Sequence, residues 1–196
     1  MMTMMRSRVI AAAAILAVVA GLAVLYVMMP APVHDAAHPP QPLAKLAVAQ
    51  TPKSIPDVAF SDASAKRLGL ADFKGRYVLL NLWATWCGPC VKELPALARL
   101  SRAVPADKLT VVAVNVGRSD AAETKAFLAK HKADALNVYV DGNVALMRAF
   151  TAYGLPVSVL IDPQGREIAR ATGAAEWDAP EAVEYFKALS EKKPAS

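Results

Sequence analysis

The Cys-Gly-Pro-Cys stretch at residues 87–90 is the feature that most constrains what this chain can fold into. It stands where an apolar run, Tyr77 to Trp83, meets a segment whose apolar residues have helical spacing, so the pattern predicts a strand, a short turn and a helix. Both cysteines would then lie at the helix N-terminus, where unpaired N–H groups and the helix dipole stabilise an anion. A thiol placed there titrates nearer pH 7 than the ~8.5 of free cysteine, so part of it is thiolate at neutral pH.

The two thiols are expected to have different roles in thiol–disulfide exchange. Cys87, at the open end of the helix, is the expected nucleophile, and Cys90, one turn further in, is expected to resolve the mixed disulfide. Three other uses of the pair stay open. A structural disulfide would close too short a loop to stabilise much. Zinc needs about four ligands, whereas the chain offers two Cys and three scattered His. Cu(I) suits soft thiolates. No resident metal or other cofactor is expected beyond the cysteine pair.

An uncharged apolar run of 21 residues, positions 9–29, stands near the start of the chain. At about 1.5 Å per residue it would span a hydrocarbon core of ~30 Å, whereas the apolar region of a cleaved signal peptide is normally about 7–15 residues long. We therefore predict an uncleaved transmembrane helix. Arg6 and Arg8 precede it, which places residues 1–8 in the cytoplasm and the rest of the chain in the periplasm, anchored to the inner membrane.

Residues 30–54, rich in Pro and Ala, are predicted to be an extended periplasmic tether. The folded domain is then predicted to cover residues 55–196, and a chain starting at Ile55 is expected to be soluble and redox-active. In this domain lysines and arginines exceed acids by only two, and the signs are interspersed, which argues against nucleic acid as a partner.

Apolar runs alternate with amphipathic segments in this domain, which predicts an α/β fold. Residues 77–84 and 109–116 are typical of strands buried on both faces, and the helix between them makes a βαβ unit with parallel strands. A third apolar strand is predicted at residues 157–161, followed by an edge strand at 166–172. The other predicted elements are extended pieces at 58–60 and 65–70, helices at 120–130, 144–150 and 180–190, and a short strand at 137–140.

Trp-Cys-Gly-Pro-Cys at the first helix, together with Gly-Leu-Pro at residues 154–156, resembles the thioredoxin fold. The resemblance runs from about residue 58 to the C-terminus. It implies a thioredoxin-like three-layer α/β fold with a central mixed sheet, here preceded by the transmembrane helix, and a cis peptide bond before Pro156. In such proteins that proline faces the cysteine pair and shapes a substrate groove, whose expected members here are Trp86, Gly88, Pro89, Leu155 and Pro156.

The chain further resembles the membrane-anchored periplasmic TlpA/ResA-like family of thiol:disulfide interchange proteins. The resemblance rests on the apolar N-terminal run, a segment inserted around residues 133–150, and the spacing Cys-x-x-Cys-x-x-Glu-x-Pro. In that family a carboxylate that tunes the thiols or relays a proton matches Glu93, so Cys87, Cys90 and Glu93 are the expected catalytic residues. The buried aspartate of soluble thioredoxins is replaced here by Asn81. The alternative for Glu93 is a solvated helix charge.

The activity implied by the resemblance is thiol–disulfide exchange. Reduction of protein disulfides is favoured because the Gly-Pro pair is that of thioredoxin, whose reduction potential is about −270 mV. The implied partners are periplasmic proteins with disulfides, either copper-site proteins of cytochrome oxidase assembly or apocytochrome c, and a membrane thiol reductase as electron donor. The alternative is a binding module that carries Cu(I) or holds unfolded substrates with the same cysteines.

Overall fold

Two parallel strands, β4 (Tyr77–Trp83) and β5 (Leu109–Asn115), form the centre of the sheet in the computed structural model, which describes residues 38–191. Helix α2 (Gly88–Ala103) connects them, so the predicted βαβ unit is confirmed. On the other side of β4, β7 (Val157–Ile161) pairs antiparallel, which makes the sheet mixed. The strand order is β1-β8-β7-β4-β5-β6-β2-β3.

The remaining elements follow the predicted order closely. Helix α3 (Ala121–Lys130) begins where expected, because Asp120 and Glu123 form a capping box: each side chain accepts the other residue's backbone N–H, at 2.8 and 3.2 Å. The other bounds are η1 (Gln41–Leu43), β1 (Leu46–Ser54), β2 (Ala59–Asp62), β3 (Arg67–Gly69), η2 (Leu70–Phe73), α3 (Ala121–Lys130), β6 (Tyr139–Val140), α4 (Ala145–Ala149), β8 (Arg166–Thr172) and α5 (Pro180–Glu191).

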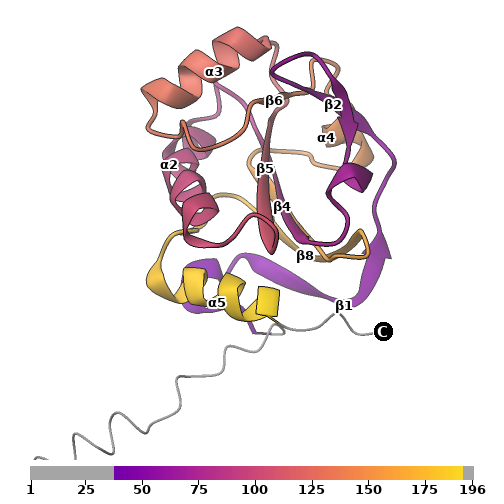
Figure 1. Cartoon of the computed structure of the whole chain (residues 1–196), viewed down its shortest axis with the longest axis vertical. Helices are drawn as coiled ribbons and strands as arrows, with labels where there is room; N and C mark the ends of the chain where they lie inside the picture. Colours follow the sequence, from indigo (N-terminus) through magenta and orange to yellow (C-terminus); the bar gives the residue numbers. More distant parts are fainter. Residues whose placement is uncertain (1–37, 192–196) are drawn as a thin grey trace, which may run out of the picture. The chain divides into compact units, whose positions relative to one another are not determined.

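Alternating side chains of the central strands build two hydrophobic cores, one on each face of the sheet. In β4, Leu79 and Trp83 belong to the core shared with α2 and α5, whereas Leu80 and Leu82 belong to the core shared with η2 and α4. Figure 1 shows α2 and α5 on one side of the sheet and α4 on the other. The predicted layered α/β fold with a mixed sheet is confirmed. Asn81 stands two residues after Leu79 in β4, so its side chain lies on the same face of the sheet, the face that α2 covers.

Residues 41–54 do not form an extended tether, and that prediction is wrong for this segment. Leu43 of η1 and Leu46 of β1 are 0% and 2% exposed in the core shared with α5. Strand β1 pairs antiparallel with β8, which is therefore an interior strand and not the predicted sheet edge. The other residues of β1 are mostly exposed because it is the outermost strand, so its sequence shows little of the apolar character that marks a buried strand.

The predicted cytoplasmic residues 1–8, the predicted transmembrane helix at 9–29 and the first residues of the predicted tether lie outside the described residues. Within residues 38–191, no helix is both long enough and apolar enough to cross a membrane.

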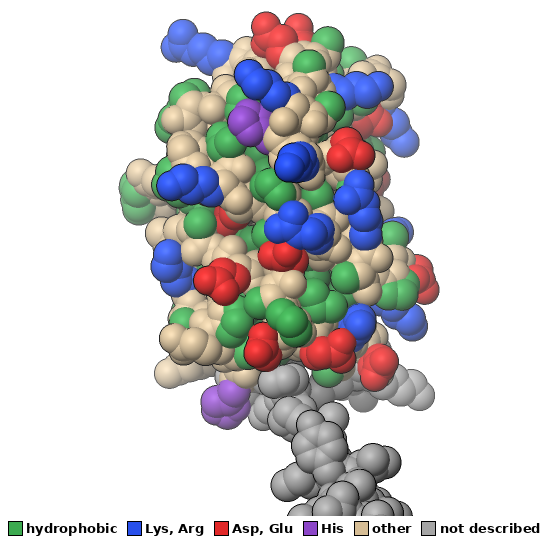
Figure 2. Space-filling model, turned by 90° about the vertical axis from the view of Figure 1, so that its left-hand side faces the viewer, with side chains coloured by type: hydrophobic (Ala, Val, Ile, Leu, Met, Phe, Trp, Pro, Cys, Tyr) green, Lys and Arg blue, Asp and Glu red, His purple; other side chains and the backbone are tan. Residues whose placement is uncertain are grey.

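Lys, Arg, Asp and Glu side chains are interspersed over the face that carries α2 and α5, as Figure 2 shows.

Candidate active site

Cys87 and Cys90 are joined by a disulfide at the N-terminus of α2, where the sequence pattern predicted them. Cys87 is the N-cap residue, and its Sγ accepts a hydrogen bond from the backbone N–H of Cys90 at 3.3 Å. Pro89 fits the first helical turn because its missing N–H would have no helical partner there. After reduction, the same N–H and the helix end favour a thiolate on Cys87 over one on Cys90.

The two cysteines also differ in access. Cys87 is 6% exposed and Cys90 is 0% exposed, whereas the neighbouring Trp86 is 72% exposed. A substrate sulfur approaching this helix end therefore meets Cys87 first, which agrees with its predicted role as the nucleophile.

In the reduced protein, Cys87 is expected to alkylate about tenfold faster than Cys90 below about pH 8, because it is the more exposed thiol and the helix end stabilises its thiolate. Iodoacetamide labelling followed by peptide mass spectrometry measures both rates. The urea-unfolded protein is the control, in which the two rates should converge. Equal rates in the folded protein, or a faster rate for Cys90, would contradict the assignment of Cys87 as the nucleophile.

Glu93 is buried one turn after Cys90 and holds three hydrogen bonds. Its Oε1 accepts from Asn81 Nδ2 at 2.8 Å, and its Oε2 accepts from Trp177 Nε1 at 2.8 Å and from the Ala175 N–H at 3.2 Å. The side chain is only 4% exposed, so the alternative of a solvated helix charge is wrong. Burial raises the pKa of Glu93 above its ordinary 4.5, while the three hydrogen bonds lower it in part.

Asn81 occupies the strand position where the resemblance places the acid of soluble thioredoxins, and here it is a donor to the acid on the helix. Its Nδ2 also donates to Ser158 Oγ at 2.9 Å, across the pairing of β4 with β7. Both residues are 0% exposed. Asn81 Oδ1 is buried without a hydrogen-bond partner, so the amide has an acceptor to spare.

Trp177 is a site residue that the sequence reasoning missed. It follows β8 in the loop before α5, is 0% exposed, and donates its indole N–H to Glu93. The one signal in the sequence is a tryptophan among small and acidic residues at positions 173–178. Such a tryptophan is expected to be buried, and a buried indole N–H normally has a hydrogen-bond partner. Because the partner is 84 positions away in sequence, only the fold identifies it.

Of the residues predicted to form the substrate groove, Trp86, Gly88 and Pro89 lie at the N-terminus of α2. The Leu155–Pro156 peptide bond is cis, as the resemblance implied. Leu155 packs against the core that contains both cysteines, and a pocket of about 450 Å³ beside Trp86 reaches the β5–α3 loop at Arg118. Tyr153, which the sequence reasoning passed over, is 95% exposed just before this segment. Contact of Trp86, Gly88, Pro89, Leu155 and Pro156 with substrate stays a prediction.

Metal-type side chains do not gather around the cysteines. Across residues 38–191, no group of three or more His, Cys, Asp or Glu is placed to hold a metal ion.

A cysteine pair at the N-terminus of the helix after the first central strand, with a cis-proline opening the strand beside it, defines a thioredoxin-fold thiol–disulfide oxidoreductase. The chain belongs to the Redoxin family, whose model matches residues 50–189.

Curated relatives carry the same activity in their names. The chain is 35% identical over 118 residues to the thiol-disulfide oxidoreductase ResA of Bacillus subtilis, a match that covers 60% of this chain and 65% of that protein. It is 30% identical over 138 residues to ResA of Bacillus thuringiensis, covering 70% of this chain and 78% of that protein. The match thus spans just under two thirds of the Bacillus subtilis protein.

Solved structures extend the similarity to the fold. A Chlorobium tepidum protein assigned as the thiol:disulfide interchange protein DsbE superposes with a TM-score of 0.61 at 29% identity, covering 72% of this chain and 97% of that one. The exposed lipoprotein thioredoxin Etrx1 of Streptococcus pneumoniae superposes with a TM-score of 0.56 at 26% identity, covering 67% of this chain and 98% of that one.

Proposed function

We propose that the protein reduces disulfides of periplasmic proteins, and that residues 9–29 hold it at the outer face of the inner membrane. The observation that most supports thiol–disulfide exchange is the helix-end position of Cys87 together with a buried Glu93, one turn after Cys90, that accepts three hydrogen bonds. Such a site favours a thiolate on Cys87 and offers a base one helical turn from Cys90. The Gly-Pro pair between the cysteines is that of thioredoxin, a dithiol of low reduction potential, and this favours reduction of substrates over their oxidation.

The reaction begins with the reduced protein. The Cys87 thiolate attacks one sulfur of the substrate disulfide, a bond forms between Cys87 and that sulfur, and the other substrate sulfur leaves as a thiolate that takes up a proton. Cys90 then loses its proton and attacks Cys87 Sγ, which releases the second substrate thiolate. The substrate has gained two electrons, and the protein ends with the Cys87–Cys90 disulfide.

Glu93 is the proposed acceptor of the Cys90 proton. It lies one turn further along α2, and burial raises its pKa above the ordinary value, which makes the carboxylate a stronger base. Asn81, Trp177 and the Ala175 N–H hold the carboxylate in place during both steps.

The proposed partners follow from this chemistry. A protein that donates two electrons in an oxidising compartment has to be reduced again, so a membrane thiol reductase is the proposed donor. Copper-site proteins of cytochrome oxidase assembly, or apocytochrome c, are the proposed substrates, since both classes need a reduced cysteine pair.

Trapping of mixed disulfides tests the proposal. Cys90→Ser should accumulate covalent complexes through Cys87 in cells, visible as bands that disappear with dithiothreitol, and mass spectrometry identifies the trapped proteins. Cys87→Ser is the matched control and should trap none. A reductase is contradicted if Cys90→Ser traps nothing and the wild-type protein instead copurifies with Cu(I), which is the result expected of the copper-carrying alternative.

A further inference from the structure

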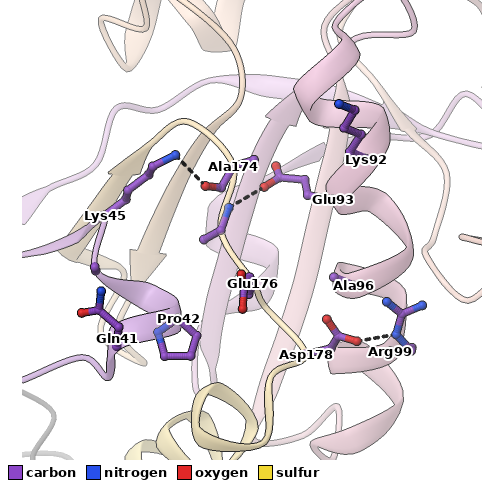
Figure 3. Close-up of a pocket in the computed structure, with 12 residues that line it drawn as sticks. Gln41, Pro42, Lys45, Lys92, Glu93, Ala96, Arg99, Ala174, Glu176 and Asp178 are labelled. Carbon is purple, nitrogen blue, oxygen red and sulfur yellow. Dashed lines mark hydrogen bonds and ion pairs between the residues drawn. The ribbon is translucent and has the colours of Figure 1, made fainter.

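A cavity of about 610 Å³ reaches Glu93 from between α2, η1 and the segment that follows β8 (Figure 3). The residues lining it include Glu93 but neither cysteine, and neither Trp86 nor Pro156. A substrate that covers Cys87 can therefore leave this cavity open. The cavity is therefore an approach to the buried Glu93 that is separate from the two cysteines.

Lys45, between η1 and β1, lies at the wall of this cavity. Its Nζ donates a hydrogen bond to the carbonyl oxygen of Ala174 at 3.0 Å, as the dashed line in Figure 3 marks. The lysine side chain also passes close over Gly173: a Cβ on that glycine would lie 3.3 Å from Nζ and 3.7 Å from Cδ. Gly173 has a φ of +92°, so both its backbone conformation and this close approach favour glycine.

The three residues at 173–175 connect separate parts of the active site. The N–H of Gly173 donates to the carbonyl oxygen of Pro156 at 2.8 Å. The carbonyl of Ala174 accepts from Lys45, and the N–H of Ala175 donates to Glu93 at 3.2 Å. Because the three residues are consecutive, a displacement of Ala174 would disturb the hydrogen bond on each side of it.

We propose that Lys45 is a positioning residue of the thiol–disulfide site: it holds residues 173–175 between Pro156 and Glu93 and places its ammonium group on the cavity side of Glu93. The inference rests on the proposed function, because it concerns the same carboxylate. Lys45 belongs to a segment that the sequence patterning placed in the tether.

The charges around the cavity single out Lys45. Arg99 of α2 is engaged by Asp178, so these two largely offset each other. Lys92 and Glu176 also line the cavity. Among these side chains, Lys45 is the one whose charge lowers the pKa of Glu93, against the larger effect of burial, which raises it. Loss of the Lys45 charge therefore raises the pKa of Glu93 further and favours its protonated form, in which it cannot accept a proton from Cys90.

The test measures how fast the reduced full-length protein reduces dithiobis-nitrobenzoate by stopped flow, between about pH 5 and pH 9. Glu93→Gln identifies the limb of the pH profile that belongs to Glu93. Lys45→Met is expected to move this limb to higher pH and to slow the reaction near pH 7 by about two- to fivefold, the size of effect that a solvent-screened charge produces. Lys45→Arg should retain the wild-type limb.

Lys53→Met is the matched control, since Lys53 is an exposed lysine of β1 that does not line the cavity. The position of a limb does not depend on the amount of folded protein, so partial unfolding of a variant does not mimic the result. Coincident profiles for Lys45→Met and wild type, or an equal shift in Lys53→Met, would overturn the inference alone. A wild-type protein no faster than Cys87→Ser would overturn the proposed function and the inference with it.

Discussion

A chain that begins at residue 55 is expected to be far less stable than one that begins at residue 38. The shorter chain lacks β1 and the side chains of Leu43 and Leu46, which are 0% and 2% exposed. Burial of such a side chain contributes about 1.5–3 kcal/mol, so about 3–6 kcal/mol of stabilisation is at stake. This is comparable with the whole stability of an ordinary domain, about 5–15 kcal/mol. Urea denaturation followed by circular dichroism compares the two chains directly.

Two point substitutions on β1 separate core packing from simple loss of sequence. Leu46→Ala is expected to lower the free energy of unfolding by about 2–5 kcal/mol. Val48→Ala, on the same face of the strand but 38% exposed, should change it by less than about 1 kcal/mol. If the chain from residue 55 unfolds at the same urea concentration as the chain from residue 38, β1 is dispensable and the domain begins where the sequence patterning put it.

Glu93→Gln is expected to slow disulfide reduction by about 100-fold near neutral pH and to lower the thiol pKa, with little loss of stability. The rate falls because Cys90 loses its proposed proton acceptor, and the thiol pKa falls because a buried negative charge one helical turn from Cys90 is gone. The fold tolerates the change because the unpaired Asn81 Oδ1 can turn to accept from the new amide N–H. The measurements are stopped-flow disulfide exchange and titration of the thiols by their thiolate absorbance at about 240 nm.

The same substitution has a signature in the pH dependence of stability. The pKa of Glu93 is raised in the folded protein, so its contribution to stability is fully present below about pH 4.5, the ordinary value, and is lost as the pH rises through the folded-state pKa. Glu93→Gln should remove this decline, whereas Glu184→Gln, an exposed acid on α5, should keep it. Identical thiol titrations, exchange rates and stability profiles in wild type and Glu93→Gln would leave Glu93 without a catalytic role.

The sequence by itself determined the central part of the fold and the reactive pair. Continuous apolar runs mark β4, β5 and β7 because these strands are buried on both faces, and local signals such as the Asp120–Glu123 capping box mark helix ends. Cys87 and Cys90 are three residues apart, so the helix start alone brings them together. Each of these features depends on residues that are close together in the sequence, so the order of residue types along the chain is enough to predict it.

Only the tertiary structure decided what surrounds Glu93. Asn81, Ala175 and Trp177 meet its carboxylate from 12, 82 and 84 positions away, and Lys45 reaches the same segment from 129 positions away. No local spacing encodes such contacts. For the same reason the sequence predicts a tether where β1 lies. The side chains of this outermost strand are mostly solvated, so it has no strong periodicity, and its strand character comes from hydrogen bonds to β8, which follows more than 100 positions later.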